Sequence, residues 1–155
     1  MVDGQTMELI RRNLTIEPHL TIAAADLTCP EVGLGAPTLL RDAAIEYSAE
    51  LHARIIGSRL FWGPYLSLRP GVYLFKFDGR IEGELTVDFA HRGGNIRLKK
   101  ESLTDFDRPV CVVVTQPAVD FEVRGIKTEA LRSLRLQAIA MHRAYIPQKD
   151  DAREW

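Results

Sequence analysis

Cysteine is scarce in this chain, and the two that it has follow no recognised pairing pattern. Cys29 and Cys111 are the only cysteines among 155 residues. Their separation matches neither a zinc-ligand spacing nor a redox motif, so we expect both to be small buried apolar residues. A disulfide between them would require an oxidising compartment. The sequence leaves open whether they are thiols.

Histidine clusters and catalytic motifs are also missing. The four histidines are spread along the chain, and none stands two or four residues from another: His19, His52, His91 and His142. This spacing argues against a zinc site and against the close histidine cluster of cupin enzymes. The chain also lacks a Gly-x-Ser-x-Gly elbow, a Cys/His nucleophile arrangement and a glycine-rich phosphate loop. We therefore expect no enzyme activity and no cofactor.

Neither a surplus of charge nor a long apolar run is present. The net charge of −1 gives no general attraction to nucleic acid or to an anionic membrane. No stretch approaches the ~20 apolar residues of a membrane helix. The first residues, Met1 to Gln5, have no basic region before an apolar one, unlike a signal peptide. We expect a cytoplasmic protein with neither nucleic acid nor a membrane as its partner.

The length and composition are those of one globular domain. Apolar residues make up 46% of the chain and charged residues 26%, which is ordinary for a domain that builds its own core. We expect residues 1–155 to form a single domain. Within it we expect an N-terminal segment at 1–20, a sandwich core at 45–143 and a flexible tail at 147–155. The secondary structure of residues 1–20 and 38–48 is ambiguous.

From about residue 45 onward, the chain consists of short segments in which apolar and polar residues alternate, separated by turn residues. A helical turn up to about Ala44 precedes a strand over 45–55, where apolar and polar residues alternate. Arg69-Pro70-Gly71 and Asp78-Gly79 predict tight turns. Further strands are expected at Leu66–Leu68, Val72–Phe77, Gly83–Phe89, Ile96–Leu98, Val110–Thr115, Val119–Val123 and Leu134–His142. About eight to ten strands, with one short helix at most, predict an all-β antiparallel sandwich.

Two of these strands carry more specific expectations. Tyr73, Phe75 and Phe77 lie at alternate positions and therefore share one strand face, which we expect to be buried in the core. The run Val110–Thr115 has no charged residue, which is typical of a strand covered on both faces.

The segment from Phe61 to Phe77 supports a family resemblance. It contains Trp62-Gly63-Pro64-Tyr65, then a short strand, a Pro70-Gly71 turn and Tyr73. This pattern resembles bacterial jelly-roll domains that are similar to carbohydrate-binding modules. The closing segment, Leu131 to Arg143, is similar to the final strand of those domains, and the likeness covers roughly residues 50–143. The resemblance implies a β-sandwich of jelly-roll type that binds sugars or other partners.

Sugar-binding modules place an aromatic ring against the apolar face of a sugar and use charged side chains for its hydroxyls. The candidate ligand contacts are Trp62, Tyr65, Arg54 and Arg69, with Asp88 as a weaker candidate and Arg59 nearby. The alternative is that Trp62 and Tyr65 pack in the core or at an edge.

Polar residues alternate along several of the predicted strands. They are Lys76, Asp78, Glu84, Thr86, Asp88, Glu122 and Arg124, with His91 and Arg92 following the third strand. If these strands are neighbours, their polar sides form one charged face, either solvated with ion pairs or serving as a binding surface. The basic run Arg97–Lys100 is expected to be a solvated strand end. A structural Ca²⁺ would require Asp78, Glu82, Glu84 and Asp88 to converge.

Taken together, these patterns favour a non-catalytic binding module that recognises a saccharide or a polysaccharide-related ligand. The first alternative is a structural protein that forms homo-oligomers through its β-edges. The second is a jelly-roll enzyme that acts on glycans. Ligand identity, bound ions and oligomeric state are open at this stage.

Overall fold

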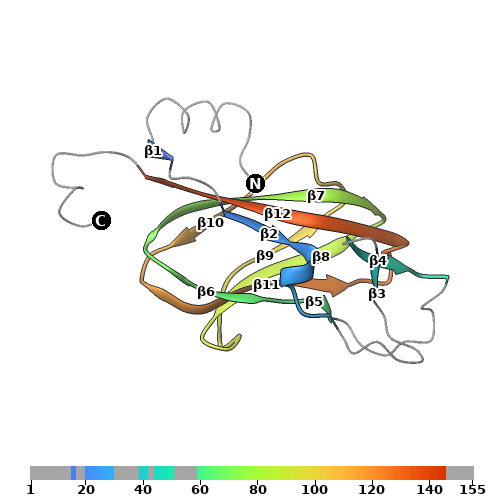
Figure 1. Ribbon diagram of the computed structural model, residues 1–155, viewed down its shortest axis with the longest axis horizontal. Coiled ribbons are helices and arrows are strands. Elements are labelled where there is room, and N and C mark those ends of the chain that lie inside the picture. Colours follow the sequence, from blue (N-terminus) through green and yellow to red (C-terminus); the bar gives the residue numbers. More distant parts are fainter. Residues whose placement is uncertain (1–14, 17–19, 30–38, 42–43, 51–58, 146–155) are drawn as a thin grey trace.

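The computed structural model consists of two antiparallel β-sheets packed face to face (Figure 1). It describes residues 15–16, 20–29, 39–41, 44–50 and 59–145. The described part holds twelve strands and one short 3-10 helix, η1 (Ala24–Asp26). The prediction of an all-β sandwich is confirmed, and the strand count exceeds the eight to ten expected. In the described ranges, no helix has the length and apolar character needed to cross a membrane.

The larger sheet has seven strands. Its order is β10 (Val110–Val114), β7 (Gly71–Glu82), β12 (Ser133–Tyr145), β4 (Ala44–Ser48) and β3 (Leu39–Arg41). Two further strands, β2 (Leu20–Ala23) and β1 (Thr15–Ile16), also pair with β12. In Figure 1 the long strands β7 and β12 run side by side across the upper part of the view.

The smaller sheet has five strands. Its order is β5 (Arg59–Phe61), β11 (Ala118–Lys127), β8 (Leu85–His91) and β9 (Ile96–Leu103), and β6 (Pro64–Leu68) also pairs with β11. This sheet positions the candidate site described below.

The pairing of the strands identifies the topology. β4 pairs with β12, β5 with β11, β7 with β10, and β8 with β9. Each pair is nested inside the one before it, so the chain wraps around the sandwich as a jelly roll does. The predicted jelly-roll type is therefore confirmed by strand order.

The core lies between the sheets and is rich in aromatic rings. Tyr73, Phe75 and Phe77 of β7 are all buried, as predicted from their alternation. The Phe75 ring centroid lies 4.9 Å from that of Phe89 and 5.7 Å from that of Phe121. Residues of β7, β8 and β11 thus meet across the sandwich, within the separation at which aromatic pairs attract.

Two turn and strand predictions are wrong. Asp78-Gly79 is not a turn, because β7 continues through it to Glu82 while its pairing with β12 shifts register at that point. Gly79 has φ 152°, and a Cβ there would lie 1.9 Å from the carbonyl oxygen of Arg135, so only glycine lets the two strands approach. The expected helical turn before Ala44 is also wrong where it is described, since Leu39–Arg41 is strand β3.

Edge position explains a third difference. The apolar run was expected to be covered on both faces, but β10 is the last strand of the larger sheet and Val113 is 56% exposed. Cys111, half-buried on the same strand, forms no disulfide with Cys29, which is also half-buried. Burial raises the pKa of the Cys111 thiol, and the nearby Lys99 opposes this.

Several predictions fall on residues that the structure does not describe. These are most of the N-terminal segment 1–20, residues 51–55 of the expected 45–55 strand, and the tail 147–155. Within the described part that strand is shorter than expected, because β4 ends at Ser48 and a turn follows.

Candidate functional site

Neighbouring strands of the smaller sheet bring polar residues together on its outer face. Arg124 of β11 lies opposite Asp88 of β8, which lies opposite Lys100 of β9. In the next row, Glu122 of β11 lies opposite Ala90 of β8, and Ala90 lies opposite Arg97 of β9. The predicted single charged face is divided, however, because Lys76 and Asp78 belong to β7 in the other sheet.

The charged residues at the centre of this face are buried. Asp88 is 0% exposed, Glu122 3% and Arg124 7%. Of the two alternatives for this face, the solvated one is wrong at its centre, although cross-strand ion pairs are present there. Charges removed from water require partners that satisfy them, and the side chains supply these partners to one another.

Arg124 makes the central contacts. Its Nε donates to Asp88 Oδ1 and its Nη2 to Asp88 Oδ2, both at 2.6 Å. This is the two-point geometry that makes arginine–carboxylate pairs strong. Arg124 Nη1 also lies 3.6 Å from Glu122 Oε1. The hydrogen bonds to Asp88 raise the pKa of Arg124 against the opposing effect of burial, so the guanidinium stays charged.

Arg97 completes the group at the edge of the sheet. Its Nε lies 3.4 Å from Asp88 Oδ2, and its side chain is 53% exposed. We call Asp88, Arg97, Glu122 and Arg124 the charged network. Its two carboxylates and two guanidinium groups balance in charge, and only Arg97 reaches far into solvent.

The turn between β8 and β9 covers the charged network. Gly94 in this turn has φ 86°, and a Cβ there would lie 2.8 Å from Arg124 Nη1 and 3.6 Å from Glu122 Oε1. The backbone therefore lies directly against the ion pair and excludes water from it. A glycine is needed for both the close approach and the positive φ.

Tyr65 joins the charged network from β6. The residue follows the cis Gly63–Pro64 bond and has φ 69°, which is uncommon for a bulky residue. Burial raises the pKa of its hydroxyl, as do the charge of Glu122 and the hydrogen bond to it. Arg59 acts in the opposite direction, so it too lies near this hydroxyl. Half of Tyr65, 50%, remains exposed, which leaves an anchored ring open to solvent.

The other predicted ligand contacts are placed differently. Trp62 is half-buried, and its backbone pairs with Thr28. Arg69 is exposed in the turn after β6, where its carbonyl accepts a hydrogen bond from the Tyr73 hydroxyl at 2.6 Å. Arg54 lies outside the described residues.

Asp88 requires a correction. It was a candidate ligand contact, but it is fully buried and Arg124 occupies both of its oxygens. Asp88 lies beneath the exposed side chains of this face and holds Arg124 in position. Glu122, Arg124 and Arg97 were not singled out as site residues, although the alternation of Glu122 and Arg124 with apolar residues marked them as neighbours on one face.

The possible calcium ligands do not meet. Asp78 and Glu82 lie on β7 of the larger sheet, whereas Asp88 lies on β8. Across the described residues, no three histidine, cysteine, aspartate or glutamate side chains form a group able to hold a metal ion.

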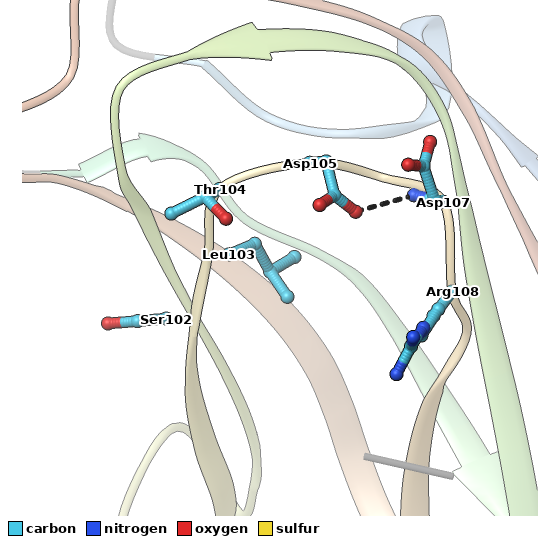
Figure 2. A pocket seen from close by; sticks show the side chains of 6 residues that line it. All are labelled: Ser102, Leu103, Thr104, Asp105, Asp107 and Arg108. Carbon is cyan, nitrogen blue, oxygen red and sulfur yellow. Dashed lines mark hydrogen bonds between the residues drawn. The ribbon is translucent and has the colours of Figure 1, made fainter. Parts of the chain in front are cut away.

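A separate hollow of about 350 Å³ lies beside the loop between β9 and β10. Its lining residues are Ser102, Leu103, Thr104, Asp105, Asp107 and Arg108. Figure 2 shows the backbone nitrogen of Asp107 donating to Asp105 Oδ1, at 2.9 Å, which is a turn formed within the loop itself. That hydrogen bond stabilises the loop, and none of the six lining residues belongs to the charged network.

Comparison with known proteins identifies no relative of this chain. No protein-family model, no curated protein and no solved structure matches the chain significantly.

Proposed function

We propose that this chain is a non-catalytic binding module whose ligand is a saccharide or a polysaccharide-related molecule. The ligand docks on the outer face of the five-stranded sheet, with a sugar ring against Tyr65. The observation that carries the proposal is that the Tyr65 side chain is half exposed, while its hydroxyl is hydrogen-bonded to the buried Glu122. An aromatic ring held in place before binding loses little entropy when a ligand stacks on it.

The pairing of the carboxylates favours binding over catalysis. A general acid or base must reach a proton on its substrate. Asp88 has both oxygens bonded to Arg124, and Glu122 is enclosed between Arg124 and Tyr65. These groups suit a rigid support for the exposed ring better than proton transfer.

The edges of the sandwich weigh against the assembly alternative. A β-edge pairs with another chain when its backbone groups are open. On β10, the Cys111 carbonyl accepts a hydrogen bond from Lys99 Nζ at 2.8 Å. On β9, the opposite sheet's edge, four charged side chains discourage pairing: Arg97, Lys99, Lys100 and Glu101. Lysines of β9 thus protect the β9 edge directly and occupy one backbone carbonyl of the β10 edge.

The test is a binding titration of the whole chain against a panel of plant and bacterial polysaccharides and their short fragments. We expect Tyr65→Ala to weaken binding at least about tenfold, because one stacked aromatic ring is lost. Tyr65→Phe keeps the ring and should retain most of the affinity. Val113→Ala, at an exposed apolar residue of the other sheet, is the matched control and should bind as the parent does.

Two results would overturn the proposal. One is a folded parent protein that binds no saccharide of the panel at millimolar concentration. The other is binding that Tyr65→Ala leaves unchanged. Light scattering of the same samples tests the alternative, since a protein built to assemble through its edges would not be monomeric.

A further inference from the structure

The exposed rim around Tyr65 and the charged network is richer in cations than in acids. Arg97 and Lys100 project from β9, Arg92 lies in the turn that covers the network, and all three are exposed. Arg59 lies near the Tyr65 hydroxyl, where Asp120 is the nearby acid. This local surplus contrasts with the overall charge of −1. A positive rim attracts and orients an anionic ligand.

Arg97 is a member of this rim that also contacts the charged network. Arg124 already satisfies both oxygens of Asp88, so the contact of Arg97 through Nε at 3.4 Å is an additional one. Arginine presents five N–H donors in a planar fork suited to a carboxylate. Because its side chain is 53% exposed, Arg97 can offer its terminal nitrogens to a ligand while its Nε contacts Asp88.

The order of the strands defines the distance between Tyr65 and Arg97. β6, β11, β8 and β9 follow one another, so three strand spacings of about 4.8 Å separate the backbones of Tyr65 and Arg97 by roughly 14 Å. Glu122 and Arg124 fill the interval below the surface, under the Gly94 turn. A ligand that contacts both ends must be a short chain of sugar units lying across the strands.

We propose that the ligand is an acidic saccharide, with one sugar ring stacked on Tyr65 and a carboxylate of a further unit paired with Arg97. This inference rests on the proposed function and specifies its ligand class. Stacking supplies the sugar contact at one end, and the guanidinium selects the charged unit at the other.

The experiment compares oligouronates with their methyl esters, which keep the ring and remove the charge. Oligogalacturonate and oligoglucuronate of two to four units are titrated into the whole chain by calorimetry, each beside its ester. We expect at least one acid to bind about tenfold more tightly than its ester, as for one charge-assisted hydrogen-bonded pair. Arg97→Gln should abolish that difference without weakening binding of the ester, and Arg97→Lys should restore part of it.

Arg132→Gln is the matched control, because Arg132 is an exposed arginine in the turn before β12, remote from β9 in sequence and outside the five-stranded sheet. It should leave the preference for the acid intact. Thermal unfolding of each variant is measured beside the titrations, and Arg97→Gln should fold because Asp88 keeps its two bonds to Arg124.

The possible failures are distinguishable. If acids and esters bind equally, the inference is overturned and the proposed saccharide function stands. If neither acids nor esters bind, the inference is overturned, and the proposed saccharide function is overturned with it only when the polysaccharide panel also fails to bind. Equal binding of the uronates, sulfated dextran and polyglutamate, or an equal loss in Arg132→Gln, would indicate unspecific attraction to positive charge and would also overturn the inference.

Discussion

The two faces of strand β8 in the five-stranded sheet are both buried, but by opposite means. Asp88 and Phe89 are consecutive residues of β8, and each is 0% exposed. Phe89 points to the core and gains about 1.5–3 kcal/mol from leaving water. Asp88 points outward, and its burial would destabilise the fold if Arg124 did not pair with it. Burial on the inner face is therefore a source of stability, and on the outer face it depends on complete pairing.

The largest expected effect comes from removing the partner of Asp88. Arg124→Met should destabilise the fold by about 3 kcal/mol, because a buried carboxylate is left without its bidentate partner. Arg97 offsets part of this cost through its contact with Asp88. Chemical denaturation of the variant measures the change in the free energy of unfolding.

A double-mutant cycle isolates the pairing from the loss of packing. Combining Arg124→Met with Asp88→Asn should recover part of the loss, giving a coupling energy of about 2 kcal/mol. Phe75→Leu with Phe89→Leu is the inner-face counterpart and should show a smaller coupling, about 1 kcal/mol. Equal coupling on both faces would contradict the contrast between them.

This contrast also explains which features can be predicted from the sequence. The inner face follows from alternation, since Tyr73, Phe75 and Phe77 needed only their period of two to be placed in the core. Alternation also put Asp88, Glu122 and Arg124 on a polar side. It could not predict their burial, because the cover comes from the β8–β9 turn and from Tyr65, which other parts of the chain bring into place.

Local backbone conformation limited the prediction at two other points. Asp120 has φ 52°, and the pairing of β11 with β6 shifts register between Ala118 and Phe121. Val119 is consequently 44% exposed although it alternates with Phe121. Gly79 was interpreted as part of a turn because Asp-Gly usually is one. In both cases a positive φ interrupts the regular period, and the residue type alone does not reveal where.

The cover can be disturbed without touching a charge. Gly94→Ala should destabilise the fold by about 2 kcal/mol, because alanine is strained at φ 86° and its Cβ meets Arg124. Gly93→Ala is a matched control, since Gly93 also has a positive φ, 67°, but has nothing within 4 Å of the added Cβ. Both substitutions strain a positive φ, so the larger loss expected in Gly94→Ala combines its greater φ with the contact of the added Cβ with Arg124. Equal losses would show that the turn does not press on the network.

The smallest effect concerns Tyr65, where the outer face meets solvent. Burial raises the pKa of its hydroxyl above the ordinary value of 10.0, and the charge of Glu122 and the hydrogen bond to it act in the same direction. A folded state that binds the proton more tightly contributes stability that is fully present below pH 10. That contribution is lost as the pH rises through the higher folded pKa.

Alkaline titration followed by the ultraviolet absorbance of phenolate should therefore show one tyrosine, absent in Tyr65→Phe, that ionises above its ordinary pKa. This subtraction is needed because burial also raises the pKa of Tyr47. Glu122→Gln removes the charge and should lower the pKa of Tyr65 towards the ordinary value, although burial continues to raise it. A Tyr65 that ionises at or below pH 10 in the parent protein would mean that its hydroxyl is not held by Glu122. The exposed ring would then lack the anchor that links it to the buried charges.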